Sequence, residues 1–346
     1  MQTIPLALQT AFADLIERCI DAGFDRDFDE QGQFVKVTSK GREYWYFQLY
    51  GNGTRTRRYV GPVAEDAITR RVEAFGRLKG DFSERRETVR ALSTALPQPD
   101  ALTGNIIDAL WKAGFFRLRG VLVGTVAFQT YAGLLGIKLP GAAIMTQDSD
   151  FAQFKAISDA VKDSMPPILE ILKAVDDTFE AVATIDGPAA VAFSNRQKYR
   201  VEFLTPNRSK SEYGSRPASM PALGGASAQP LRYLDFLIHE PVWSVLLHRG
   251  GIPVRVPQPA RYTVHKLIVS TLRPDRSRAK SDKDLIQAST LIEALSKRRS
   301  FELGEALHVA ETSGPKWKAA IDRAITGLGA ETLPLLEKAR DAYRSR

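Results

Sequence analysis

The chain has 346 residues and a net charge of +8; 44% of its residues are hydrophobic and 25% are charged, an ordinary balance for a folded protein of two or three domains. No apolar run approaches the ~20 residues of a membrane-spanning helix and the N-terminus lacks a basic segment, so we expect neither a membrane span nor a signal peptide. Cys19 is the only cysteine, which excludes an internal disulfide and a cysteine-rich zinc site and favours the reducing cytoplasm.

The N-terminal residues predict a helix followed by two β-hairpins, which we assign to a module of residues 1–62. Residues 5–23 have the spacing of an amphipathic helix, and residues 34–62 alternate β-branched and aromatic runs around Ser-Lys-Gly and Gly-Asn-Gly turns. Period two places Tyr44, Tyr46 and Tyr50 on one face of the second strand. Beside Arg55, Arg57 and Arg58, that face has a composition suited to stacking bases and binding phosphates, unless helices cover both faces.

The remainder divides into a helical connector (63–115), a central α+β region (116–259) and a C-terminal helical region (260–346). In the connector, helical spacing is interrupted near Gly80 and a short helix is expected near 104–114. Strand, helix and strand alternate over residues 116–205 of the central region. There the composition also predicts a long loop and two further strands: 206–230, which is rich in Pro, Ser and Gly, then 231–238 and 252–259.

A Gly-Thr pair lies where an apolar strand meets a helix, in the stretch VLVGTVAFQTYAGLL. Glycine lets the backbone approach a phosphate closely, and the free N–H groups and dipole of the helix N-terminus favour an anion. The hydroxyl of Thr125 adds a donor beside Gly124. The pair therefore predicts a phosphate contact, although strand-to-helix turns also carry glycine for geometric reasons alone.

Two aspartates follow in the stretch AAIMTQDSDF, at positions 148 and 150. On a strand, Asp148 and Asp150 project from the same face, where two like charges are unfavourable unless a cation neutralises them. Carboxylate oxygens suit Mg²⁺, which proteins hold with one or two carboxylates together with substrate phosphates. Because the pair follows the Gly-Thr turn, we expect a site for Mg²⁺ or Mn²⁺.

A third carboxylate lies on the later predicted strand QKYRVEFLTP. Alternation places Arg200, Glu202 and Leu204 on one side of this strand, and an unpaired charge among apolar residues is costly. Either Glu202 pairs with Arg200 or another base, or it is the third carboxylate of a two-metal centre with Asp148 and Asp150.

This order of motifs resembles the nucleotidyltransferase fold of the DNA polymerase β-like superfamily, and in particular bacterial proteins distantly akin to the AbiEii-type nucleotidyltransferases. The resemblance spans about residues 116–300, and the YWYFQLYGNGTRTRRYVGP hairpins are similar to those of the same group. It implies a polymerase β-like palm with a mixed sheet flanked by helices. Two positions depart from the pattern of the superfamily: Thr125 replaces a Ser or Gly, and Glu202 replaces an Asp.

The resemblance also implies functions for two lysines in the helices after the palm. The lysine that Lys266 matches contacts the triphosphate, and the pair that Lys283-Asp284 matches supports the site. From the residues alone, Lys266 equally fits a surface lysine. The surrounding segment is basic, because residues 195–299 hold 19 Lys and Arg against 8 Asp and Glu. Such an excess favours a polyanionic partner, although a solvated surface has the same composition.

We therefore expect a transferase that moves a nucleoside monophosphate from an NTP such as ATP to an acceptor hydroxyl, most simply on RNA such as a tRNA end. Asp148, Asp150 and Glu202 are the expected catalytic and metal-binding residues; Gly124, Thr125, Lys266 and Lys283 are the expected NTP-binding residues. A non-catalytic nucleotide- or nucleic-acid-binding module and a toxin-like transferase acting on tRNA or protein stay open as alternatives. The chain has no Walker-type phosphate loop and no Gly-x-Ser-x-Gly, and its four histidines lack zinc-ligand spacing.

Overall fold

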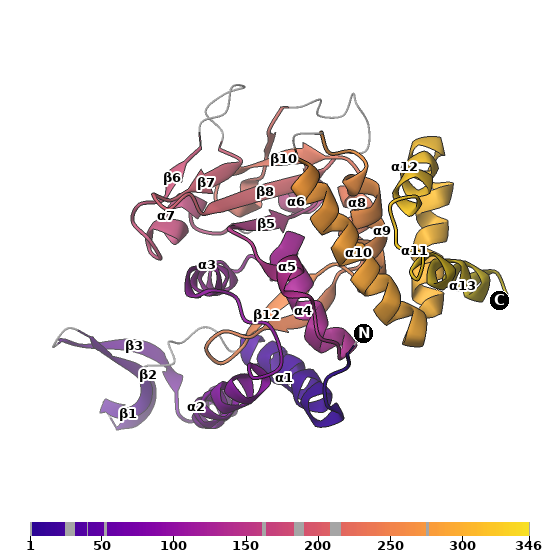
Figure 1. The fold of residues 1–346 in the computed structure, drawn as a ribbon. Helices are drawn as coiled ribbons and strands as arrows, with labels where there is room; N and C mark the ends of the chain where they lie inside the picture. The colour runs from indigo at the N-terminus through magenta and orange to yellow at the C-terminus, as the bar shows by residue number, and fades with distance from the viewer. Residues whose placement is uncertain are drawn as a thin grey trace.

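A computed structural model describes residues 2–24, 32–39, 41–51, 54–160, 164–182, 190–207, 216–274 and 277–345; within them, the side chains at 21–24, 39, 49–51, 54–61, 67, 71, 74–80 and 142 lie outside the description. Figure 1 shows an α+β molecule in which a central sheet is flanked by helices, with the N-terminal elements at one end and a helical C-terminal region at the other. The predicted α+β class, with its mixed sheet, is confirmed.

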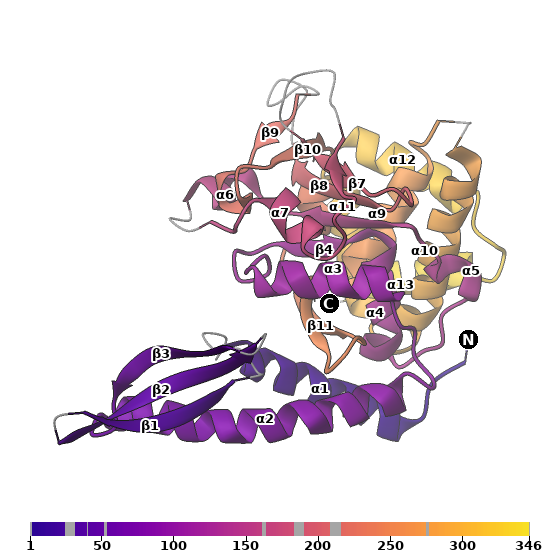
Figure 2. The ribbon, with the colours of Figure 1, turned by 90° about the vertical axis from the view of Figure 1, so that its left-hand side faces the viewer.

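The N-terminal elements are two helices and a three-stranded antiparallel sheet: α1 (Leu6–Phe24), β1 (Gln33–Ser39), β2 (Arg42–Gly51), β3 (Thr54–Pro62) and α2 (Asp66–Leu92). The predicted helix and hairpins are therefore confirmed. In Figure 2 the small sheet and α2 extend to one side, below the rest of the molecule.

Helix α2 is continuous, so the predicted break near Gly80 is wrong. Glycine costs a helix roughly 1 kcal/mol relative to alanine, which tertiary contacts readily offset. Just after this glycine, Asp81 accepts hydrogen bonds from Arg18 of α1 and from Arg85, and Arg85 also donates to the carbonyl of Gly250 at 2.9 Å. Packing against α1 and the turn at Gly250 thus holds the helix through the glycine.

The central region is built on a mixed sheet of seven strands in the order β4-β5-β8-β10-β9, with β7 also paired to β8 and β6 to β7. Strand β8 is parallel to both β5 and β10, whereas β4 and β7 pair antiparallel to β5 and β8. The strands are β4 (Val121–Val123), β5 (Asp148–Ala152), β6 (Glu180–Ala181), β7 (Ala192–Ser194), β8 (Arg200–Pro206), β9 (Ala218–Ser219) and β10 (Ser227–Leu231).

Two expectations in this region need correction. The predicted loop at 206–230 includes β9, the short 3-10 helix η1 (Pro221–Leu223) and β10, while its residues 208–215 lie outside the description. The predicted strand at 231–238 is instead the end of β10, a turn and the short helix α8 (Leu234–Leu237). Strand β10 joins the sheet because it pairs with β8. Local composition does not predict such a contact between distant segments.

Helices and a separate hairpin complete the fold. The helices around the sheet are α3 (Ala101–Lys112), α4 (Gly124–Leu135), α5 (Gly141–Ile144), α6 (Lys155–Ala160) and α7 (Ile168–Lys173). The hairpin is β11 (Val242–Leu246) with β12 (Ile252–Val256), and β11 has no counterpart in the predicted strands. As expected, the chain is helical after residue 259: α9 (Pro259–Ser270), α10 (Arg278–Arg298), α11 (Ser300–Thr312), α12 (Pro315–Ile325) and α13 (Leu333–Arg344).

Aromatic packing fills the face of the sheet opposite the aspartates. Phe151 and Phe203, in register on β5 and β8, stack with ring centroids 5.6 Å apart, and Phe115 meets Phe151 edge to face at 5.2 Å. All three rings are fully buried. Because strand side chains alternate, this packing directs residues 148, 150, 200 and 202 to the other face. No helix among the described residues is long and apolar enough to cross a membrane.

A smaller second core joins the N-terminal helices to the central region. Leu15 of α1 and Leu92 of α2 pack there with Ala132 of α4 and with Val245 and Leu247 of the β11 hairpin. The domain boundaries at 62, 115 and 259 stay predictions, but α1 and α4 share this core.

Candidate functional site

The Gly-Thr turn lies where β4 ends and α4 begins, directly against Asp150. Gly124 has φ +68°, which favours glycine, and a Cβ built on it would lie 2.3 Å from Oδ2 of Asp150. Thr125 is buried in the first turn of α4. A side chain at position 124 would therefore occupy the space that the Asp150 carboxylate needs.

A buried tyrosine of α9 holds this turn from the other side. The hydroxyl of Tyr262 lies 3.0 Å from the carbonyl oxygen of Gly124 and 2.9 Å from Oε1 of Gln287 on α10. The amide nitrogen of Gln287 donates to the carbonyl of Ala143 in α5, at 2.8 Å. Both acceptors therefore compete for the single phenol proton. Through these bonds, α9 and α10 contact the glycine turn and α5, the short helix that precedes Asp148.

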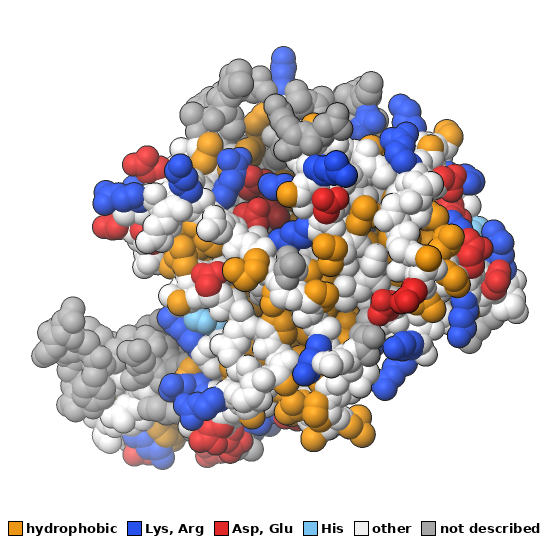
Figure 3. Space-filling model, in the orientation of Figure 1, with side chains coloured by type: hydrophobic (Ala, Val, Ile, Leu, Met, Phe, Trp, Pro, Cys, Tyr) orange, Lys and Arg blue, Asp and Glu red, His pale blue; other side chains and the backbone are white. Residues whose placement is uncertain are grey.

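The three predicted carboxylates lie on neighbouring strands and on one face of the sheet. Asp148 and Asp150 are on β5, and the parallel register places Glu202 of β8 opposite Asp150. Burial, together with the nearby charges of Asp148 and Glu202, raises the pKa of Asp150 to about 7. Figure 3 shows acidic side chains in a hollow over β5 and β8, with Lys and Arg side chains around it.

Two of the three carboxylates, Asp148 and Glu202, interact with a residue on the same strand or just before it. Asp148 accepts a hydrogen bond from the hydroxyl of Thr146, and Glu202 forms an ion pair with Arg200, one of the two interpretations of its sequence. Within the described residues, no three His, Cys, Asp or Glu side chains are arranged to hold a metal ion. The three acids are nevertheless close enough to influence the pKa of Asp150, and carboxylate oxygens are the donors that Mg²⁺ prefers, so a metal site here stays a prediction.

Cations from α9 and α10 lie close to the acids. Lys266 and Lys280 oppose the raised pKa of Asp150, which places both near this carboxylate. Lys266 is buried, and its Nζ lies 2.7 Å from Asp284 and 5.2 Å from the ring centroid of Tyr262. Burial lowers the pKa of Lys283, which donates to the carbonyl of Met145.

Asp284 is the counter-ion of this group of cations. Its carboxylate is buried and accepts from both Lys266 and Arg273. Despite burial, which acts the other way, the charge of Lys266 and the hydrogen bond from Arg273 lower the pKa of Asp284. Asp284 thus keeps Lys266 in place, and part of the charge of Lys266 is already neutralised.

The structure therefore brings together most of the predicted residues: Gly124, Thr125, Asp148, Asp150 and Glu202 meet at the ends of three strands. Lys266 and Lys283 approach from the helices, where Lys283 contacts the segment before Asp148. Their roles stay predictions. Sequence reasoning missed Tyr262 and Gln287; the spacing of Tyr262 four residues before Lys266, on one helix face, was the available signal.

The aromatic face proposed for the N-terminal hairpins is only partly described. Tyr44 and Tyr46 are half-buried and each has an interaction partner. The side chains of Tyr50, Arg55, Arg57 and Arg58 lie outside the described residues.

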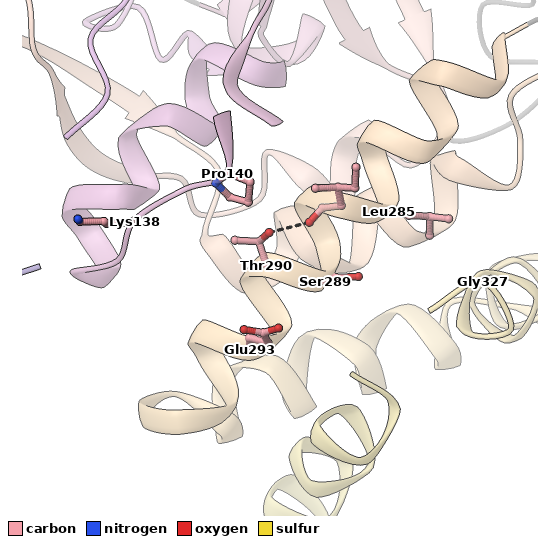
Figure 4. Close-up of a pocket in the computed structure, with 8 residues that line it drawn as sticks. Lys138, Pro140, Leu285, Ser289, Thr290, Glu293 and Gly327 are labelled. Atoms are coloured by element: carbon pink, nitrogen blue, oxygen red, sulfur yellow. Dashed lines mark hydrogen bonds between the residues drawn. The ribbon is translucent and has the colours of Figure 1, made fainter. Parts of the chain in front are cut away.

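A pocket of about 350 Å³ lies away from the carboxylates, between α10 and the loop that follows α4. Figure 4 shows residues of both segments around it, among them Lys138, Pro140, Thr290 and Glu293. None of the predicted site residues lines this pocket.

A family model described as "Nucleotidyltransferase" matches residues 101–311. A crystal structure of an antigenic nucleotidyltransferase-like protein from Paracoccidioides brasiliensis is 16% identical over 65% of this chain and 94% of that chain, with a TM-score of 0.29. No curated protein matches the sequence. The family match contains the Gly-Thr turn, all three carboxylates and both predicted lysines, and it confirms the predicted nucleotidyltransferase; the bacterial, AbiEii-type resemblance stays a prediction.

Proposed function

The chain belongs to a nucleotidyltransferase family, and we propose that it transfers a nucleoside monophosphate from an NTP to a hydroxyl of RNA. The observation that carries this proposal is the position of Asp148, Asp150 and Glu202 on adjoining strands beside the glycine turn. The basic excess of residues 195–299 supports RNA as the acceptor.

We propose that the NTP binds across the turn and the cations. The free N–H groups at the start of α4, with the hydroxyl of Thr125, suit the β- and γ-phosphates. Gly124 has no side chain to hinder this approach, and Lys266 and Lys283 add positive charge where negative charge develops on the leaving pyrophosphate. In this proposal, most of the rate enhancement comes from positioning the substrates and from electrostatic stabilisation of the transition state.

Mg²⁺ or Mn²⁺ fits the donor set, with Asp148 and Asp150 as the expected ligands and Glu202 as the third. When bound, the metal lowers the pKa of the attacking hydroxyl and offsets charge on the phosphate oxygens. In the reaction, the acceptor oxygen forms a bond to the α-phosphorus, the bond from that phosphorus to the bridging oxygen breaks, and pyrophosphate leaves. We propose that Glu202 receives the hydroxyl proton after Arg200, its partner in the structure, has moved from its carboxylate.

The pairing of Glu202 with Arg200 also favours a second candidate, a nucleotide-binding module without catalysis. If Arg200 stays on Glu202 when an NTP binds, only two carboxylates remain for metal. Replacing Arg200 by glutamine distinguishes the two functions, because an enzyme that must release this arginine before it binds metal gains Mn²⁺ affinity in the variant. A module whose Glu202 needs its arginine partner is instead destabilised without any change in Mn²⁺ binding.

The experiment incubates the protein with α-³²P-labelled NTPs, Mg²⁺ or Mn²⁺, and pools of RNA, protein or small molecules. The comparison is the double variant Asp148→Asn/Asp150→Asn, with Asp322→Asn as a control for an exposed aspartate on α12 that pairs with Lys318. We expect label in the RNA pool with wild type and the control but not with the double variant. In parallel, Mg²⁺ should raise the melting temperature of wild type and of the control but not of the double variant, because it relieves the repulsion at Asp150. Label in no pool, with no thermal shift, would contradict the proposal.

A further inference from the structure

The β11–β12 hairpin presents an exposed tryptophan directly opposite an arginine. Trp243 is 39% exposed and pairs in register with Arg255, whose guanidinium carbon lies 5.7 Å from the centroid of the indole ring. This is within the range of a cation–π contact. The neighbouring side chains Val245 and Val254 are buried, so Trp243 is the large apolar side chain that this hairpin exposes.

Among the described residues, Arg255 has no acidic counter-ion. Its Nε is buried without a hydrogen-bond partner, and neither Arg255 nor Arg119 forms an ion pair with any residue in the described part of the chain. Burial lowers the pKa of Arg255, and the positive charge of Arg119 lowers it further. Arg119 is exposed, has φ +67°, and precedes β4, which packs against β12.

A half-buried guanidinium that also feels the positive charge of a second arginine is unfavourable without an anion. Elsewhere in this protein, buried cations have carboxylate partners, as Lys266 has in Asp284. An anion from outside the chain would fill that role at Arg255 and Arg119. The flat indole of Trp243 adds a surface on which an unpaired base stacks, so the ligand combines phosphates with exposed bases.

We propose that Trp243, Arg255 and Arg119 form a binding site for single-stranded RNA, in which a base stacks on Trp243 and the two arginines contact phosphates. A protein partner fits less well, because one exposed indole among cations offers little apolar area to bury. The choice of RNA over another polyanion rests on the proposed function. The site lies apart from the carboxylates: Arg119 precedes Gly124 by five residues of strand and turn, on the order of 15 Å. At ~3.4 Å per stacked nucleotide, a few nucleotides span that distance.

The test measures binding of a fluorescein-labelled 20-nucleotide single-stranded RNA by fluorescence anisotropy, without NTP or divalent metal, over a series of KCl concentrations. The variants are Trp243→Ala, Arg119→Gln and Arg255→Gln, and Arg298→Gln is the control for an exposed arginine on α10. Far-UV circular dichroism and melting curves identify any variant that does not fold. Because Trp243 and Arg119 are exposed, their variants keep the test decisive if Arg255→Gln fails to fold.

We expect Trp243→Ala to bind about tenfold more weakly at every salt concentration, as loss of one base–aromatic stack predicts. Each arginine variant should weaken binding and reduce the slope of log K against log[KCl] by about one. Wild-type affinity in Trp243→Ala and Arg119→Gln would overturn the inference, as would an equal loss in Arg298→Gln. So would binding of anionic phospholipid vesicles, with loss in the same variants, when RNA does not bind.

The transfer assay separates this inference from the proposed function. RNA binding that depends on Trp243, together with no transfer of label to RNA, would support the binding site and contradict the RNA acceptor. Transfer to RNA with an unchanged KM for RNA in Trp243→Ala would support the acceptor and overturn the binding site.

Discussion

Replacing Gly124 by alanine tests whether the turn is glycine in order to make room for a catalytic carboxylate. The added Cβ would lie 2.3 Å from Oδ2 of Asp150, so that this carboxylate must move by about 1 Å to reach an ordinary contact distance. Alanine at φ +68° also costs about 1–2 kcal/mol of backbone strain. A misplacement of ~1 Å in a reacting group costs on the order of 100-fold in rate.

We therefore expect Gly124→Ala to remain folded, with a melting temperature a few degrees lower, and to lose on the order of 100-fold in kcat for transfer of labelled NMP. Gly225→Ala is the matched control, because Gly225 has φ +76° but nothing within 4 Å of an added Cβ. It carries the same backbone strain without displacing a carboxylate. Its kcat should equal that of wild type while its melting temperature falls by a similar amount.

Near wild-type kcat in Gly124→Ala would refute the reasoning, because Asp150 would then tolerate displacement or have no part in the reaction. An equal loss of kcat in Gly225→Ala would refute it differently: general destabilisation, and not the position of Asp150, would account for the effect.

Three further predictions concern buried groups of α9 and α10. Tyr262→Phe removes the donor to Gly124 and should lower the free energy of unfolding by about 1–2 kcal/mol in urea titrations, with a larger effect on kcat than on KM for NTP; an unchanged kcat would contradict a positioning role. Asp284→Asn leaves Lys266 buried without its counter-ion and should cost about 3–5 kcal/mol in the same titrations, so a loss below 1 kcal/mol would show that the ion pair is not buried in solution. Burial, together with the positive charge of Lys266, lowers the pKa of His265 from its ordinary 6.5 to about 3, so the unfolded chain binds the extra proton and stability falls as pH drops below 6.5. Between pH 7.5 and 5, wild type should lose about 2 kcal/mol relative to His265→Gln, and parallel pH profiles would contradict this.

Much of the local structure follows from short-range patterns. Turn residues and alternation predicted the N-terminal hairpins, and strand periodicity placed Asp148 and Asp150 on one face. The glycine at 124 was also predictable, because a tight strand-to-helix turn with a positive φ favours glycine. Each of these signals lies within a few residues of the chain, where sterics and hydrogen-bond geometry determine the outcome.

Contacts between distant segments decided the rest. Helix α2 continues through Gly80 because α1 and the turn at Gly250 pack against it, and residues 227–231 join the sheet because β8 offers a paired edge. Neither partner is visible in the local sequence. The composition of residues 206–230 indicated only a long loop.

The candidate site divides in the same way. The sequence by itself predicted which side chains carry the chemistry, since residue type sets charge and donor capacity. Only the tertiary structure decided that Glu202 lies opposite Asp150, that Arg200 occupies the carboxylate of Glu202, and that Tyr262 holds the turn from α9. Strand register and helix packing join residues far apart in the chain, and the raised pKa of Asp150 depends on the burial and the charges that this packing brings together.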